Sequence, residues 1–212
     1  MSRILKLLFF LLIIRPIVLI GLGLNVVNRD NLPLRGPAII AAHHNSHFDT
    51  MVLMSLYPLS KLHLVRPVAA ADYFLKNRFI AWFSTKVIDI LPLARFGADK
   101  NTVFDGCVAA LRKNQILILF PEGSRGQPEQ LGTIKKGLFH LAQKAPDAPV
   151  IPVVMHGLGK TLPRGAMIPV PFNCDVVIGK PLPRQNTADA FVDTLRQSFE
   201  ESAQYCITRR EA

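Results

Sequence analysis

Residues 38–56 read AIIAAHHNSHFDTMVLMSL: a short apolar run, a polar stretch with three histidines, and a second, mostly apolar run that ends at Leu56. The first run is continuously apolar rather than alternating, which is typical of a strand covered on both faces of its sheet. The second run, from Ser46 to Leu56, is predicted to be a helix. A buried strand that passes directly into a helix is the basic unit of α/β folds.

The same order of strand and helix continues along the chain. Further strands are predicted at Leu64–Ala70, Val87–Leu93, Gln115–Phe120, Val150–Met155 and Asp175–Ile178. Further helices are predicted at Asp72–Ser84, Asp99–Lys113, Thr133–Lys144 and Thr187–Tyr205. This alternation predicts a single α/β domain with a mainly parallel central sheet flanked by helices. A chain of 212 residues has room for one such domain and little more.

An apolar segment precedes this domain, because residues 4–24 read ILKLLFFLLIIRPIVLIGLGL. As one helix it would extend about 31 Å, roughly the thickness of the hydrocarbon layer. Arg15 is costly at bilayer depth and Pro16 removes a helix hydrogen bond, so two short helices in one leaflet are an equal alternative. A signal peptide and a buried core helix are the other interpretations. We favour a hydrophobic, membrane-associating helical segment.

Charge and composition indicate an anionic partner. The formal net charge is +10, and half of the residues are hydrophobic. Basic charge on an apolar chain favours a lipid surface over nucleic acid, and no nucleic-acid-binding motif is present. A basic membrane- or nucleic-acid-binding module nevertheless stays open as an alternative to an enzyme. The three cysteines lie far apart with no CxxC spacing, which predicts reduced thiols rather than disulfides or a zinc site.

The polar stretch after the first strand contains the best candidates for catalysis, His44 and Asp49. It follows the carboxyl end of a buried strand, where open α/β sheets bind their ligands. On one helix the two residues would be about 140° apart. They can meet if His44 lies in the turn before the helix and Asp49 in its first turn. The carboxylate would then fix the tautomer of the imidazole and leave its other nitrogen to act as a base.

Other interpretations of this stretch stay open. Ser46 and Asp49 form a capping-box-like pattern, so Asp49 could only cap the helix. His43 and His47 are four residues apart and could bind a metal with Asp49, but no second ligand cluster follows and no metal is predicted. A serine nucleophile is disfavoured, because EGSRG lacks the first glycine of GxSxG and Ser46 has no glycine frame. We interpret His43 and His47 as bystanders.

A second polar cluster follows the strand Gln115–Phe120, where residues 121–126 read PEGSRG. The glycines allow a ligand to approach the backbone closely. Arg125 supplies a forked donor that suits phosphate, and Glu122 could orient this arginine or accept a hydrogen bond from a hydroxyl. The cluster is therefore a candidate phosphate site.

More basic residues are expected near the same edge of the sheet. Arg95 ends the strand-like run IDILPLAR, and Lys135 and Lys136 begin a predicted helix, a natural place for phosphate. Because the carboxyl ends of parallel strands share one edge, Arg95 and Arg125 are predicted to lie on the same rim as His44.

Four motifs make the chain resemble the glycerolipid acyltransferases, a family that includes the 1-acylglycerol-3-phosphate acyltransferases. The first motif, H-x4-D, is matched by His44–Asp49, and the second, an apolar strand ending in arginine, by Ile90–Arg95. The third, F-P-E-G-[ST]-R, is matched in full by Phe120–Arg125, and the fourth, an apolar strand centred on proline, by Val150–Val153. Order and spacing agree over roughly residues 30–180.

The resemblance implies direct acyl transfer. His44, held by Asp49, would take the proton from the free hydroxyl of a lysophospholipid, and the oxygen would attack the thioester of acyl-CoA or acyl-carrier protein. The expected acceptor is 1-acyl-sn-glycerol-3-phosphate, giving phosphatidic acid, with glycerol-3-phosphate, a lyso-ornithine lipid or a hydroxylated lipid A precursor as alternatives. The residues implied in substrate binding are Arg95, Glu122, Gly123, Ser124, Arg125 and Pro152. No metal or bound cofactor is implied.

These inferences predict a membrane-anchoring segment over residues 1–28 and an acyltransferase domain over residues 29–212. The expected partners are membrane lipids and the acyl donor, with no nucleic acid. The expected location is the inner membrane, with the catalytic domain on its cytoplasmic side. The oligomeric state is not predicted.

Overall fold

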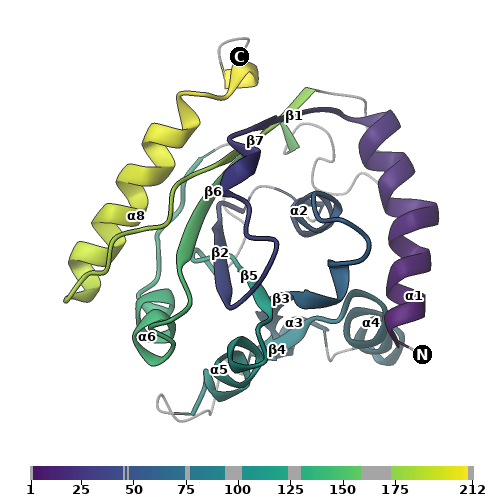
Figure 1. The fold of residues 1–212 in the computed structure, drawn as a ribbon, viewed down its shortest axis with the longest axis horizontal. Helices are drawn as coiled ribbons and strands as arrows, with labels where there is room; N and C mark the ends of the chain where they lie inside the picture. The colour runs from purple at the N-terminus through teal and green to yellow at the C-terminus, as the bar shows by residue number, and fades with distance from the viewer. Residues whose placement is uncertain are drawn as a thin grey trace.

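The computed structural model describes residues 2–44, 46, 48–74, 77–93, 102–123, 130–158 and 173–209, and within them it shows an α/β fold built on one sheet (Figure 1). The strand order is β1-β7-β6-β2-β5-β3-β4. The strands are β1 Gly23–Val27, β2 Ala38–Ala42, β3 Val65–Ala70, β4 Leu91–Leu93, β5 Ile116–Leu119, β6 Val150–His156 and β7 Asn173–Ile178. Of the paired strands that the structure describes, β6 and β7 alone run antiparallel. The prediction of a mainly parallel sheet is confirmed.

Helices cover both faces of the sheet, which gives three layers (Figure 1). They are α1 Ser2–Phe9, α2 Asp49–Ser55, α3 Ala71–Phe74, α4 Arg78–Phe83, α5 Asp105–Arg112, α6 Gly137–Lys144 and α8 Ala188–Ala203. Side chains of successive strand residues enter opposite layers. In β2, Ile40 packs with the N-terminal helix and α2, whereas Ile39 packs with α5, α6 and α8. Two apolar cores therefore lie back to back across β2, β5 and β6.

Three of the predicted elements differ from the structure. Strand β1 lies at the end of the segment assigned to the membrane anchor, and it pairs in parallel with β7. The predicted helix Asp72–Ser84 is two helices, and the Asn77 side chain begins the second by accepting from two backbone N–H groups. The predicted strand Val87–Leu93 starts with a helical turn over Ser84–Ile88, which ends where Asp89 takes a left-handed conformation (φ 66°). Strand β4 consequently begins only at Leu91.

The apolar N-terminal segment forms one helix, Arg3–Gly21, long and apolar enough to cross a membrane by length and composition. It continues through Pro16, with π-helical turns at Phe10–Ile14 and Ile17–Gly21 on either side. One strip of this helix packs on the domain, and it consists of every fourth residue: Lys6, Phe10, Ile14 and Val18. The buried Leu22 continues this series directly after the helix ends. Of the two alternatives for this segment, the continuous helix is the one that the structure shows.

The contacts of Lys6 and Arg15 explain how this helix accommodates these two basic side chains. Lys6 donates from Nζ to the Val65 carbonyl (2.7 Å), and Arg15 donates to the Tyr57 carbonyl (2.9 Å). Lys6 also lies 3.7 Å from the Asp89 carboxylate. Both cations therefore point into the domain and not away from it, so neither needs a place in hydrocarbon.

Candidate active site

His43 and His44 leave the carboxyl end of β2, and they point to opposite faces of the sheet. The backbone N–H of His43 still pairs with the Val153 carbonyl of β6 (3.0 Å), so the strand alternation extends to these residues. The His44 ring lies on the side of α2 and packs against Phe120, with ring centroids 4.1 Å apart and planes 26° apart. The His43 ring lies on the side of α8, with its centroid 6.5 Å from that of Phe199.

His44 and Asp49 meet in the geometry that the sequence suggested. His44 Nδ1 lies 2.8 Å from Asp49 Oδ2, with His44 in the turn after β2 and Asp49 in the first turn of α2. Asp49 is completely buried, while the His44 side chain keeps 18% of its surface exposed. A carboxylate only accepts hydrogen bonds, so Nδ1 carries the hydrogen. The other ring nitrogen, Nε2, has no hydrogen-bond partner among the described residues and is available to take a proton.

The capping interpretation of Asp49 holds as well. Asp49 Oδ2 also accepts from the backbone N–H of Ser46 (2.8 Å), as the acidic residue of a capping box does. The Ser46 hydroxyl accepts from the Phe48 N–H (3.3 Å), so it also serves the start of the helix. One carboxylate oxygen therefore both fixes the turn and orients the imidazole.

Glu122 lies in the turn after β5 and is almost completely buried. Its Oε1 accepts from the His43 ring (Nδ1, 2.8 Å) and from the His44 backbone N–H (2.9 Å). Its Oε2 accepts from the Gly132 N–H (2.8 Å). Burial alone raises the pKa of this carboxyl, but the His43 ring and the two backbone donors outweigh burial and hold the pKa of Glu122 below its ordinary value. Glu122 is thus a charged acceptor.

Gly123 supplies a position that only glycine fits well. Its backbone is left-handed (φ 73°), and an added Cβ would lie 2.9 Å from Lys135 Nζ. The Lys135 side chain therefore lies over Gly123. The backbone N–H of Lys135 donates to the Pro121 carbonyl (2.9 Å). The structure brings Lys135, the first lysine of the TIKKG stretch, to the PEG turn. Lys136 instead pairs with Asp189 (2.6 Å).

The structure says little about the other residues that were predicted to bind substrate. Arg95, Ser124 and Arg125 lie outside the described residues, and so does His47. Pro152 is in the middle of β6, where it lies beside Ala41 of β2 and accepts from the Gly179 N–H. Substrate binding by these residues, and by Glu122 and Gly123, stays a prediction. Sequence reasoning missed Phe120 as a contact of the imidazole and Gly132 as a donor to Glu122, since neither has a chemical signature of its own.

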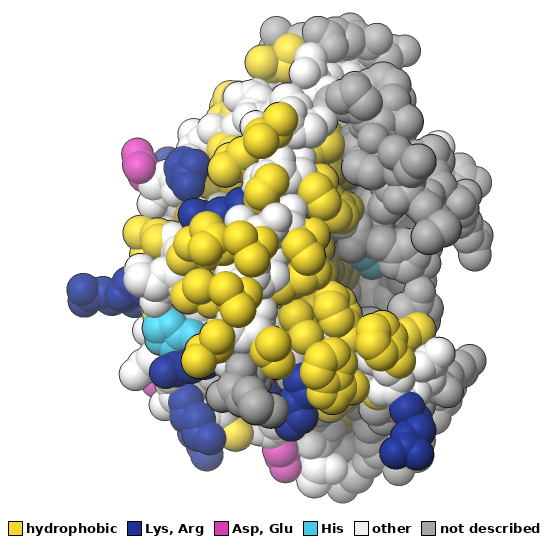
Figure 2. Space-filling model, turned by 90° about the vertical axis from the view of Figure 1, so that its right-hand side faces the viewer, with side chains coloured by type: hydrophobic (Ala, Val, Ile, Leu, Met, Phe, Trp, Pro, Cys, Tyr) yellow, Lys and Arg dark blue, Asp and Glu magenta, His cyan; other side chains and the backbone are white. Residues whose placement is uncertain are grey.

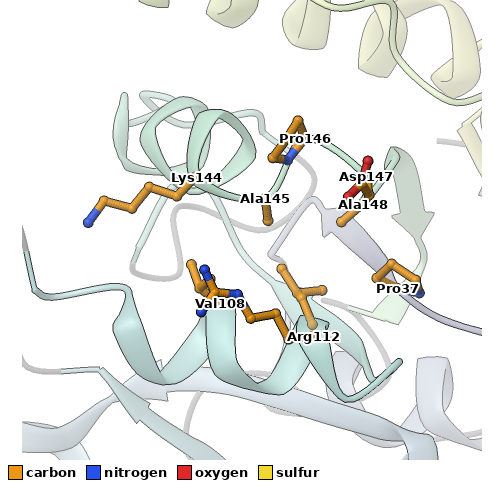
Figure 3. Close-up of a pocket in the computed structure, with 9 residues that line it drawn as sticks. Pro37, Val108, Arg112, Lys144, Ala145, Pro146, Asp147 and Ala148 are labelled. Atoms are coloured by element: carbon orange, nitrogen blue, oxygen red, sulfur yellow. The ribbon is translucent and has the colours of Figure 1, made fainter.

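The described part of the chain shows no group of three or more His, Cys, Asp or Glu side chains that could hold a metal ion. A pocket of about 200 Å³ between α5 and the end of α6 is lined by Pro37, Arg112, Lys144 and Asp147, among others (Figure 3). Pro37 precedes β2, so this pocket lies at the amino end of a strand whose carboxyl end carries His44. It is therefore separate from the candidate active site.

A sequence model described as Acyltransferase matches residues 23–156, which is more than half of the chain. The chain belongs to the acyltransferase family. The matched region begins at β1 and includes His44, Asp49 and the PEGSRG turn. It also begins inside the segment 1–28 that the sequence assigned to the anchor.

Similar proteins support the same family. The chain is 30% identical to the chloroplastic 1-acyl-sn-glycerol-3-phosphate acyltransferase LPAT1 of Arabidopsis thaliana over 84% of this chain and 49% of that protein. It is 27% identical to the 1-acyl-sn-glycerol-3-phosphate acyltransferase of Pseudomonas aeruginosa over 86% and 68%. The crystal structure of the 1-acyl-sn-glycerophosphate (LPA) acyltransferase PlsC from Thermotoga maritima has a similar fold (TM-score 0.68, 17% identity, covering 87% of this chain and 73% of that one). The chain spans about half the length of several of its relatives.

Proposed function

We propose that this acyltransferase moves a fatty acyl group from a thioester to the free hydroxyl of 1-acyl-sn-glycerol-3-phosphate, giving phosphatidic acid. The observation that carries the proposal is the His44–Asp49 pair, with Nε2 of His44 available at the carboxyl edge of the sheet in a member of the acyltransferase family. The choice of acceptor is supported by the relatives named above, which act on this lysophospholipid by name.

In the proposed reaction His44 acts as a general base. Nε2 takes the proton of the acceptor hydroxyl while its oxygen attacks the carbonyl carbon of the thioester. The C–S bond then breaks, the thiolate leaves, and the imidazolium returns the proton to the sulfur. Asp49 holds the ring through Nδ1 and stabilises the imidazolium that forms. The donor is acyl-CoA or acyl-carrier protein, and the steps need neither a metal nor a bound cofactor.

Purified protein is expected to consume acyl-CoA or acyl-carrier protein only when lysophosphatidate is present, and to form phosphatidic acid. Mass spectrometry of the lipid product and release of free thiol measure the two halves of the reaction. A panel with glycerol-3-phosphate, lyso-ornithine lipid and lysophosphatidylcholine tests the acceptor. Preference for one of these over lysophosphatidate would contradict the proposed substrate, and no transfer to any of them would contradict the activity.

The exposed apolar side chains support a membrane surface as the place of work. They gather on the side of the molecule that carries the N-terminal helix and α4 (Figure 2). On the N-terminal helix and α4, the most exposed of them are Ile4, Leu12, Ile13, Leu19, Ile20, Phe79 and Trp82. Exposed apolar patches of this kind mark membrane or protein contacts, and basic side chains at the border of this one suit anionic lipid (Figure 2). We propose that this apolar patch inserts into the surface of a membrane.

The packing of the N-terminal helix suggests how it meets lipid. One strip of it is bound to the domain, so the helix lies along the domain, with its outer face free for the acyl region of one leaflet. The cytoplasmic side is proposed because thioester donors are found there. The buried cysteines Cys107, Cys174 and Cys206 are thiols rather than disulfides, which agrees with a reducing compartment.

Replacing Phe79 and Trp82 together with serine is expected to lower the affinity for anionic phospholipid vesicles by at least about tenfold, since each removed side chain gives up part of roughly 2 kcal/mol of apolar burial. The two side chains are 69% and 48% exposed, so their loss should leave the melting temperature close to that of the wild type. Vesicle co-sedimentation measures the change. Tyr205→Ser, an exposed aromatic residue outside this patch, is the matched control, and equal binding by all three proteins would contradict the proposed surface.

A further inference from the structure

Three hydrogen-bond donors from two segments meet on the carboxylate of Glu122. They are the His43 ring and the His44 backbone N–H from the end of β2, and the Gly132 N–H from the segment that leads to α6. Both oxygens of Glu122 are engaged inside the protein, and the side chain is only 3% exposed. A group in this position links the segments around the candidate site to one another.

The Glu122 carboxylate continues the sheet where the strands stop. The ladder between β2 and β5 ends with the pair Ala41 and Leu119. Beyond this pair, the His44 N–H donates to the Glu122 side chain and not to a backbone carbonyl. Because a charged acceptor forms stronger hydrogen bonds than a neutral one, this contact fixes the backbone at the residue whose ring must meet Asp49.

His43 cannot act on the same side as the candidate base. Its ring lies on the opposite face of the sheet from the His44 ring, is packed near Phe199, and leaves only 6% of the residue exposed. Gly132 has no room for a side chain, because an added Cβ would lie 2.7 Å from Glu122 Oε2. His43 and Gly132 thus donate to Glu122 inside the protein.

We propose that His43 and Glu122 are positioning residues: together they fix the backbone of His44 so that its ring engages Asp49, and neither contacts the substrate. This inference rests on the proposed function and gives Glu122 a role different from the substrate binding that the sequence suggested. It also gives a role to His43, which the sequence analysis interpreted as a bystander. The placement of His44 matters because a catalytic group displaced by about 1 Å can lose a hundredfold in rate.

The sharpest test compares two substitutions of His43. In His43→Asn the side-chain amide nitrogen is the same number of bonds from the backbone as Nδ1, so it can still donate to Glu122. In His43→Leu a methyl group takes that place. We expect His43→Leu to lower kcat by about 10- to 100-fold with KM for donor and acceptor within about twofold, and His43→Asn to retain kcat within about threefold. His140→Leu, an exposed histidine on α6, is the control and should match the wild type.

Three kinetic results would overturn the proposal. Unchanged kcat in His43→Leu would show that placement does not depend on His43. Equal losses in the leucine and asparagine variants would show that the donor is not what matters. A raised KM at unchanged kcat in either variant would indicate contact with substrate.

Nitrogen NMR of labelled histidine supplies a readout that does not depend on acyl transfer. In the wild type, the Nδ1–H of His43 should exchange slowly with solvent, because it is buried and bonded to Glu122. In His43→Leu the ring signals of His44 should shift, while the thermal unfolding transition is kept. Rapid exchange of the His43 proton in the wild type would overturn the proposal even if no variant folds. A wild type that transfers no acyl group yet shows the slow proton would instead contradict the proposed function alone.

Discussion

Replacing His44 with alanine is expected to reduce kcat for acyl transfer to lysophosphatidate by about a thousandfold or more. The ring provides the proposed base through Nε2, and general base catalysis typically contributes 10²- to 10⁴-fold, or about 4 kcal/mol at the middle of that range. The side chain is partly exposed and its main packing partner is Phe120, so the fold should survive. Initial rates of thiol release with saturating donor and acceptor measure the change.

Two controls separate the loss of a base from other effects. His44→Ala should bind anionic vesicles as the wild type does, since His44 is not one of the exposed apolar side chains on the N-terminal helix and α4 that are proposed to meet lipid. His140→Ala removes an exposed imidazole elsewhere and should leave the rate unchanged. A His44→Ala protein that transfers acyl groups within about tenfold of the wild type would exclude His44 as the base.

Much of the fold could be predicted because the central strands carry a strong signal. β2, β5 and β6 are buried on both faces, so every residue in them except the terminal His156 is apolar, and each strand shows as a continuous run. β1 gave no such signal, because Gly23–Val27 follows the apolar N-terminal helix without a change in hydropathy. The antiparallel direction of β7 was also out of reach, since direction depends on how the chain returns and not on the composition of the strand.

The candidate site was predicted where its contacts are local. His44 and Asp49 are five residues apart, and the rule for the start of a helix was enough to suggest how they meet. The contact between His43 and Glu122 joins residues 79 positions apart, so spacing could not reveal it. The face to which each histidine points depends on how far the alternation of β2 continues, and this was visible only with the sheet in place.

The competing interpretations of Asp49 turn out to be compatible. The sequence left open whether this carboxylate caps the helix or holds the histidine, and one oxygen does both. The hydrogen bond from the Ser46 N–H fixes the carboxylate in the position from which it orients the His44 ring. Its capping role is observed, and its part in catalysis stays a prediction.

Asp49→Asn is the change expected to separate these two roles. The asparagine carbonyl oxygen can still accept from the Ser46 N–H, so the helix start should persist, but the charge that stabilises the imidazolium is lost. If the amide NH₂ instead takes the place of Oδ2, the Ser46 N–H loses its acceptor and Nδ1 must become the acceptor, so that Nε2 carries the hydrogen and cannot act as a base. Either arrangement lowers kcat, and we expect a loss of about 10²- to 10⁴-fold with KM little changed.

Asp105→Asn provides the matched control for this prediction. Asp105 is the first residue of α5, as Asp49 is of α2, but its side chain is 65% exposed and contacts Lys144 rather than a histidine. It should retain the wild-type rate. Asp49→Asn should also keep a cooperative unfolding transition, because the amide oxygen can still accept from the Ser46 N–H. The melting temperature of this variant decides how its rate is interpreted. A low kcat with a melting temperature near that of the wild type means that the carboxylate acts on His44. A wild-type kcat with a lowered melting temperature would mean that Asp49 only begins the helix.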